Sequence, residues 1–240
     1  NDFCYSPNYI HGIIYPRIFC CMIKTLIIVP AFNEEKSLGG VIDDLKKFGY
    51  KNILVVNDGS KDDTEKIARG KNVTVISHIM NRGLGAALGT GFAYAKKEKY
   101  DILVTFDADG QHKATDIESL ISPIINRQAD VVIGSRFLGK WQSMPWDRLL
   151  ANVLSNLMTF TFYGVWSSDT QSGLRAFGKK AIDLIQIRTD RMEISSEFYW
   201  EIAKNKLKLK EIPIQAIYNQ DTLKRSKQEN LAFIKLPFRL

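Results

Sequence analysis

Strand-like and helix-like segments alternate along most of this 240-residue chain. Short runs of aliphatic and β-branched residues have the length and composition of buried strands, at residues 25–29, 52–56, 73–77, 101–106 and 130–134. Longer amphipathic segments separate them, at residues 34–48, 62–70, 84–98 and 115–127. This alternation predicts an α/β fold in which helices flank a mostly parallel sheet.

Polar residues gather directly after three of the predicted strands. The clusters read PAFNEE after the first strand, NDGSKDD after the second and DADGQH after the fourth. In a parallel sheet the carboxyl ends of the strands meet at one edge, where ligands bind. We therefore expect the three clusters to lie together and to form the functional site.

Asp107 and Asp109 stand one residue apart at the end of the fourth predicted strand. A turn needs only one Asp, so the pair favours a binding role. Carboxylate oxygens suit Mg²⁺ or Mn²⁺, and Mg²⁺ commonly shares them with substrate phosphates. Zinc is disfavoured because the chain after Met22 has no Cys and only His78 and His112. The pair predicts a site for a metal-bound diphosphate.

The net charge of the chain is +7 and its pI is near 9.2. This charge fits either a solvated basic surface or an anionic partner, which is a nucleotide, a nucleic acid or an acidic membrane. A nucleic-acid-binding module is disfavoured because the aromatic residues lie in apolar runs and are not interleaved with a basic groove. The Lys-rich segment 204–212 is interpreted as the exposed side of a strand.

Length and composition, with 45% hydrophobic and 25% charged residues, fit one globular domain. All three cysteines precede Met22, so no disulfide framework is expected in the rest of the chain. Residues 1–21 show no clear period and no apolar signal-peptide core. We expect them to be an extension outside a single domain of residues 22–240.

Residues 144–166 predict an amphipathic helix, with Leu154 and Leu157 on its apolar side. Polar residues interrupt the segment too often for a helix that spans a membrane. Two interpretations stay open. Either the helix lies in the interface of a bilayer, a depth that suits Trp146 and Trp166, or it packs on the protein's own core.

Six motifs follow one another in the order IIVPAFNEE, VVNDGSKDDT, NRGLGAALGTG, FDADGQH, VVIGSRF and SDTQSGLRAF. In this order they resemble family 2 glycosyltransferases of the GT-A fold, most of all the dolichyl- and polyprenyl-phosphate hexose synthases. The resemblance spans about residues 23–228. It implies inverting transfer of a hexose from a nucleoside-diphosphate sugar, of the GDP-mannose or UDP-glucose type, to dolichyl or polyprenyl phosphate. It also implies a Mg²⁺ or Mn²⁺ cofactor and a peripheral location on the cytoplasmic face of a membrane.

On the donor side, the resemblance implies contacts with the nucleotide from Pro30, Phe32, Glu34, Asp58, Arg82 and Gly83. The first three would line the base and the ribose, and Asp58 would hydrogen-bond the base. The residues alone leave another role open for Asp58, which is to cap the following helix.

The metal site that the resemblance implies consists of Asp107, Asp109 and Gln111, with Asp109 as a direct ligand. The ion would neutralise charge on the departing diphosphate. The adjacent His112 is interpreted either as a residue that orders this loop or as a surface residue.

On the acceptor side, the resemblance implies contacts with the acceptor or the diphosphate from Arg136, Asp169, Arg175, Ser226 and Lys227. Arg148 of the amphipathic helix is also expected to meet the acceptor phosphate. A phosphate acceptor is largely deprotonated at neutral pH, whereas a hydroxyl acceptor would make Asp169 the candidate general base. Structural ion pairs remain an alternative for Arg136 and Arg175, and stabilisation of its own loop remains one for Asp169.

The glycine-rich segment after the third predicted strand does not fit a dinucleotide-binding fingerprint. Such a fingerprint follows the first strand, and Leu88 occupies its third glycine position here. The glycines are expected instead to let a helix N-terminus approach the ligand closely.

Three other functions stay open. The first is a glycosyltransferase of the same fold with a hydroxyl acceptor on a glycan; the absence of a Q-x-x-R-W signature argues against a processive synthase. The second is a sugar nucleotidyltransferase, although such an enzyme should carry a glycine-rich basic loop where this chain has PAFNEE. The third is a catalytically inactive protein that binds sugar nucleotides.

Overall fold

The computed structural model describes residues 23–138, 146–191 and 193–215, and the side chains of residues 146–152 are outside this description. The expectations for residues 1–21, for Ser226 and Lys227, and for the side chain of Arg148 therefore lie outside the described residues.

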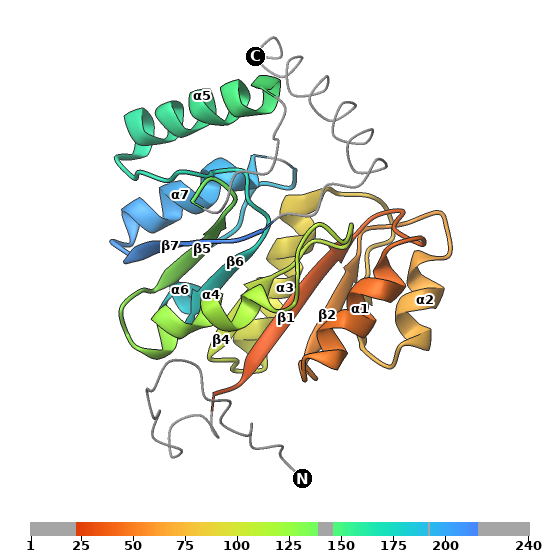
Figure 1. Ribbon diagram of the computed structural model, residues 1–240. Helices are drawn as coiled ribbons and strands as arrows, with labels where there is room; N and C mark the ends of the chain where they lie inside the picture. The colour runs from red at the N-terminus through yellow and green to blue at the C-terminus, as the bar shows by residue number, and fades with distance from the viewer. Residues whose placement is uncertain (1–22, 139–145, 192, 216–240) are drawn as a thin grey trace.

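A sheet of seven strands forms the centre of the described part, with helices on both of its faces (Figure 1). The strands are β1 (Thr25–Ala31), β2 (Ile53–Asn57), β3 (Thr74–Ser77), β4 (Ile102–Thr105), β5 (Val131–Ser135), β6 (Arg175–Gly178) and β7 (Leu209–Pro213). Their order across the sheet is β3-β2-β1-β4-β6-β5-β7. β6 runs antiparallel to β4 and β5, and the other neighbouring pairs are parallel. The predicted α/β fold with a mostly parallel sheet is confirmed.

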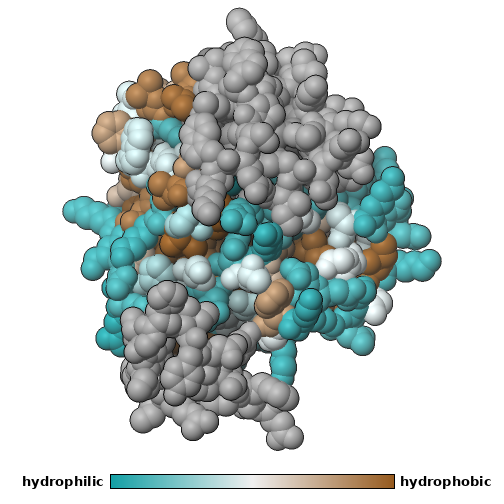
Figure 2. Space-filling view, in the orientation of Figure 1, coloured by the Kyte–Doolittle hydropathy of each residue, from teal (hydrophilic) through white to brown (hydrophobic). Residues whose placement is uncertain are grey.

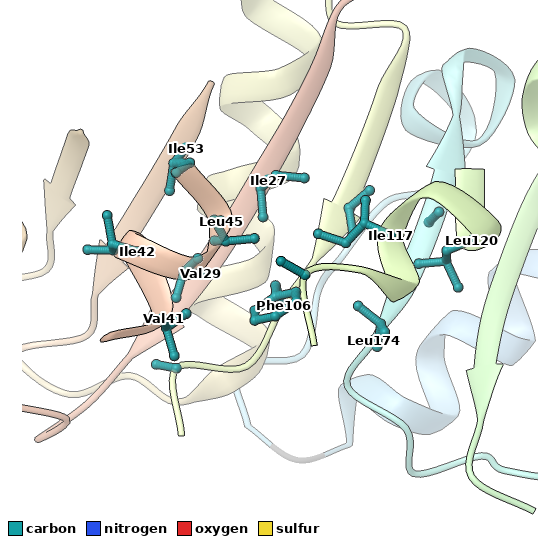
Figure 3. Close-up of a cluster of buried hydrophobic side chains, with 14 of the residues drawn as sticks. Ile27, Val29, Val41, Ile42, Leu45, Ile53, Phe106, Ile117, Leu120 and Leu174 are labelled. Carbon is teal, nitrogen blue, oxygen red and sulfur yellow. The ribbon is translucent and has the colours of Figure 1, made fainter. Parts of the chain in front are cut away.

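The helices are α1 (Leu38–Lys47), α2 (Thr64–Gly70), α3 (Leu84–Lys97), α4 (Asp116–Ile125), α5 (Trp146–Tyr163), α6 (Lys179–Leu184) and α7 (Ile194–Lys204). One hydrophobic cluster joins α1, α2 and α4 to the sheet, and a second joins α3, α6 and α7 to it. Ile27 and Val29 of β1 face the first cluster while Leu26 and Ile28 face the second, because successive strand side chains point to opposite faces. Figure 3 shows the first cluster, where side chains of α1 and α4 surround Phe106.

The carboxyl ends of β1, β2 and β4 lie at one edge of the sheet, because these strands pair in parallel. The antiparallel β6 begins at the same edge, where Arg175 pairs with Thr105 of β4. β5 ends there as well, since Ile133 also pairs with Arg175. The three polar clusters therefore share this edge, as expected, and the segments before β6 and after β5 join them.

α5 is the amphipathic helix expected from the sequence, and it turns its polar side inward. Asn156 and Thr159 are buried, and Asn156 Nδ2 donates to the carbonyl oxygen of Ser168 at 2.8 Å. The apolar Leu154 and Leu157 are 58% and 55% exposed. Figure 2 shows hydrophobic side chains gathered where α5 lies in Figure 1. Among the described side chains, α5 therefore packs on the protein through its polar side, and its apolar side does not face the core. Within the described ranges, no helix has the length and hydropathy needed to cross a bilayer.

Candidate active site

Asp107 follows β4, and two neighbours hold its carboxylate. His112 Nε2 lies 3.0 Å from Asp107 Oδ2. Gly173 lies directly against the same group, because a Cβ built on it would be 2.0 Å from Oδ2. Burial acts to raise the pKa of Asp107, but His112, Arg136 and Arg175 outweigh it and hold this pKa below its usual value. Asp107 is therefore ionised at neutral pH.

Asp109 lies in the next turn, where Gly110 adopts a φ of 76°. Its Oδ1 accepts a hydrogen bond from the backbone N–H of Gln111 at 2.9 Å, and the side-chain amide of Gln111 contacts Oδ2. Burial and the negative charge of Asp107 raise the pKa of Asp109. The two carboxylates repel each other, and a bound cation would relieve that repulsion.

The donor set of Asp107, Asp109 and Gln111 fits a hard divalent cation that is shared with a substrate. The described residues contain no group of three or more His, Cys, Asp and Glu side chains that would hold a metal ion. Mg²⁺ uses one or two protein carboxylates and completes its coordination with phosphates and water. These three residues are therefore the ones that would hold the ion together with a diphosphate.

The loops after β1 and β2 are tied together beside this site. The backbone N–H of Asn33 donates to Ser60 Oγ at 3.0 Å, and that of Glu34 donates to Oγ1 of Thr64, the first residue of α2, at 2.8 Å. Pro30 is half-buried near the end of β1, and the ring of Phe32 just beyond it is 42% exposed. The structure thus brings the first two polar clusters together and leaves an aromatic face accessible next to them.

Asp58 is buried after β2 and orders the segment between β3 and α3. Its carboxylate accepts hydrogen bonds from the backbone N–H groups of Arg82 at 3.0 Å and Gly83 at 2.7 Å, and lies 2.7 Å from His78 Nδ1. It does not cap α2, which has a different N-cap residue. The guanidinium of Arg82 contacts Asp190 at 3.0 Å. This geometry favours loop ordering over a direct contact between Asp58 and a base.

The N-terminus of α3 packs against the protein's own backbone. A Cβ at Gly85 would lie 2.1 Å from the carbonyl oxygen of Thr189, and one at Gly83 would lie 2.5 Å from that of Asp190. The backbone N–H of Ala86 donates to the Asp190 carbonyl at 3.0 Å. The glycines permit a close approach, as expected, and they approach the backbone of Thr189 and Asp190, while the expected contact with a ligand stays a prediction.

Arg136, directly after β5, forms a two-pronged ion pair with Asp169. Arg136 Nε and Nη2 donate to the two carboxylate oxygens at 2.7 and 2.8 Å, and the backbone N–H of Arg136 donates at 3.1 Å. The Asp169 side chain is 0% exposed, whereas that of Arg136 is 20% exposed. The ion pair that the sequence left as an alternative for Arg136 is therefore present, at the rim of the site.

Arg175 is buried beneath the segment that it ends. Its Nε donates to the carbonyl oxygen of Ser172 at 2.8 Å and its Nη2 donates to that of Thr170 at 3.0 Å. The guanidinium also lies 5.0 Å from the ring centre of Phe198. Burial lowers the pKa of Arg175, but an arginine remains charged. These contacts favour a role in shaping the segment over a contact with substrate.

Residues that the sequence did not single out support the segment around Asp169. Glu211 Oε1 of β7 accepts hydrogen bonds from Ser167 Oγ at 2.7 Å and from the backbone N–H of Ser168 at 2.8 Å. Tyr199 Oη donates to Ser167 Oγ at 2.9 Å, and burial raises the pKa of Tyr199 to about 12. Glu211 is the one acidic residue in the Lys-rich segment 204–212, and this was the feature of the sequence that could have identified it.

Comparison with known proteins agrees with this arrangement. Residues 26–185 match Glycosyl transferase family 2. The UDP-N-acetylglucosamine–dolichyl-phosphate N-acetylglucosaminyltransferase of Methanococcus voltae is 38% identical, over 89% of this chain and 93% of that protein. The polyprenol monophosphomannose synthase of Mycolicibacterium smegmatis is 30% identical, over 80% of this chain and 76% of that protein.

A solved structure shares the fold. It is glucosyl-3-phosphoglycerate synthase from Mycobacterium tuberculosis in complex with Mn²⁺, UDP and glucosyl-3-phosphoglycerate, with a TM-score of 0.61 and 17% identity, covering 90% of this chain and 80% of that one. The family match spans more than half of the chain, and it coincides with the strands and loops that form the site. The chain belongs to glycosyl transferase family 2.

Proposed function

We propose that the protein transfers a hexose or an N-acetylhexosamine from a nucleoside-diphosphate sugar to dolichyl or polyprenyl phosphate, with inversion at the anomeric carbon. By their names, one relative acts on dolichyl phosphate with UDP-N-acetylglucosamine and another makes polyprenol monophosphomannose. These relatives match most of the chain, and both support a lipid phosphate as the acceptor.

The ion pair of Arg136 and Asp169 is the observation that carries the choice of acceptor. Both carboxylate oxygens of Asp169 accept hydrogen bonds from Arg136, and the side chain is fully buried. A carboxylate engaged in this way is poorly placed to take a proton from a sugar hydroxyl. A phosphate monoester has a second pKa near ~6 and is already ionised at neutral pH. The geometry therefore favours the phosphate over the hydroxyl acceptor.

The donor would occupy the edge where β1, β2 and β4 end. Asp107, Asp109 and Gln111 would hold Mg²⁺ or Mn²⁺ there, and the bound ion supplies charge neutralisation for the departing diphosphate. The loop ordered by Asp58 and the exposed ring of Phe32 border the same edge. Hydrogen bonds within the protein hold the side chains of Asp58, Asp107 and Asp109 in place before a substrate binds. These side chains therefore need little rearrangement during the reaction.

Transfer assays with UDP-glucose, GDP-mannose and UDP-N-acetylglucosamine test the proposal. We expect release of nucleoside diphosphate and labelling of the lipid with at least one donor when Mn²⁺ and polyprenyl phosphate are present. Free polyprenol in place of the phosphate should give no product, and EDTA should abolish the activity. Equal transfer to polyprenol would contradict the phosphate acceptor, and activity that is unchanged in EDTA would contradict the role given to the metal.

Peripheral binding at the cytoplasmic face of a membrane belongs to the same proposal, with α5 as the contact. An interfacial helix directs its apolar side chains to the lipid, and the exposed apolar side of α5 fits this requirement. Basic residues near the acceptor site would favour anionic lipids.

A Leu157→Glu variant is expected to bind anionic vesicles about five- to tenfold more weakly than the wild type, because a charge replaces an apolar contact. The assay is co-sedimentation at low salt. Leu184→Glu on α6 is the matched control, since Leu184 is 40% exposed, and it should bind like the wild type. Wild-type protein that stays in the supernatant, or equal binding of the two variants, would contradict the role of α5.

A further inference from the structure

His112 is tightly enclosed at the end of the loop that carries Asp107 and Asp109. Its side chain is 4% exposed, and its ring meets the ring of Phe106 edge-on with 5.9 Å between the centres. Its Nε2 lies 3.0 Å from Asp107 Oδ2. The surface interpretation left open by the sequence is therefore wrong.

The opposite side of the imidazole ring shows that packing alone does not explain this residue. His112 Nδ1 is buried and has no hydrogen-bond partner among the described residues. A carboxylate oxygen accepts hydrogen bonds, so the contact of 3.0 Å with Asp107 Oδ2 assigns the donor role to Nε2 of His112. A buried polar atom without a partner is destabilising, whereas a leucine would fill the space without that penalty. Among the described residues, the polar contact that the His112 side chain makes is with Asp107, and its other ring nitrogen has no partner.

Gly173 restricts the same carboxylate from another direction. A Cβ on Gly173 would lie 2.0 to 2.4 Å from both oxygens and from Cγ of Asp107. The carbonyl oxygen of Gly173 accepts a hydrogen bond from Thr105 Oγ1 at 2.7 Å, which fixes the backbone there. Within the described ranges, His112 supplies the hydrogen bond to Oδ2, and Oδ1 accepts no hydrogen bond. The carboxylate thus has one oxygen engaged and one available.

We propose that His112 is a positioning residue for the divalent cation. By binding Oδ2 of Asp107 it holds the carboxylate in one orientation and leaves Oδ1 for the ion that accompanies the diphosphate. This inference rests on the proposed function, since it requires that a metal–nucleotide complex binds at Asp107. Residues that orient metal ligands in this way commonly change metal affinity by ~10–100-fold when they are lost.

Three variants of the full chain separate positioning from space filling. His112→Gln places an amide N–H close to the position of Nε2, His112→Asn places one near the position of Nδ1, and His112→Leu removes the donor at similar volume. The readout is the affinity for Mn²⁺ in the presence of UDP or GDP, measured by the electron paramagnetic resonance signal of the free ion. Thermal unfolding without metal is measured in parallel.

We expect His112→Leu and His112→Asn to bind Mn²⁺ ~10–100-fold more weakly, with His112→Gln within about threefold of the wild type. Ile117→Val, which trims a fully buried side chain of the cluster that contains Phe106, is the control and should bind Mn²⁺ like the wild type. Binding of Mn²⁺ by His112→Leu as tight as in the wild type would overturn the inference alone. Wild-type protein that binds no Mn²⁺ with either nucleotide would overturn it together with the metal site of the proposed function.

Discussion

Gly173→Ala is expected to reduce sugar transfer by at least ~10²-fold, because the new methyl group takes the space of the Asp107 carboxylate. The added Cβ would lie 2.0 Å from Asp107 Oδ2, far inside van der Waals contact. The backbone at Gly173 cannot readily retreat, since Thr105 Oγ1 binds its carbonyl oxygen and Leu174 beyond it is fully buried. Asp107 must therefore move, and misplacement of a catalytic group by about 1 Å can lower a rate ~10²-fold.

The measurement compares kcat, the affinity for Mn²⁺ with nucleotide, and the free energy of unfolding. Overpacking of this kind costs about 1–3 kcal/mol of stability, so the variant should remain folded at moderate temperature. Gly40→Ala is the matched control: Gly40 lies in α1 with no atom near the position of its Cβ, and alanine favours a helix by about 1 kcal/mol. Full activity and unchanged Mn²⁺ affinity in folded Gly173→Ala would show that Asp107 is not constrained as the structure indicates.

The part of the fold that local patterns encode was predictable from the sequence. β1 to β5 and α1 to α4 fall on the expected apolar runs and amphipathic segments, because each of these strands contains a run of aliphatic or β-branched residues and each of these helices shows its period. β6 was not predicted as a strand. Its sequence, RAFG, contains no such run, and its antiparallel place between β4 and β5 depends on pairing between segments far apart in the chain.

α5 shows a second limit of sequence reasoning. Periodicity reveals that a helix has a polar and an apolar side, but it does not say which side faces the protein. Here Asn156 bonds to Ser168 and Thr170, so the polar side is turned inward. That choice depends on the polar segment 167–172, which needs hydrogen-bond partners once it is buried.

The sequence predicted which residues form the candidate site better than it predicted the contacts among them. Asp107 and Asp109 could be placed from the end of a strand, whereas an ion pair was only one alternative for Arg136 and its partner, Asp169, was not predicted. Their partners come from distant parts of the chain: Gly173 reaches Asp107 because β6 pairs with β4, and Glu211 supports the segment before Asp169 because β7 pairs with β5. No local pattern specifies such contacts.

Asp169→Asn is expected to destabilise the protein by about 1–3 kcal/mol, because it removes the charge of a fully buried carboxylate that accepts three hydrogen bonds from Arg136. Urea unfolding measures this loss. Transfer activity, measured where the variant is folded, should fall mainly through the KM for the lipid phosphate, since Arg136 then lacks the contacts that orient it. A fall in kcat of ~10²–10⁴-fold, without a change in KM, would instead support proton abstraction by Asp169.

The double variant Arg136→Gln/Asp169→Asn distinguishes the two roles further. If Asp169 acts through Arg136, the double variant should be no worse than the poorer single variant in acceptor KM, because both changes remove the same interaction. In stability it should recover part of the loss, since both charges of the pair are then removed together. If Asp169 is a base, the two changes remove separate contributions and their effects on transfer should multiply. Multiplying effects, together with a normal KM in Asp169→Asn, would reject the phosphate-acceptor argument built on this pair.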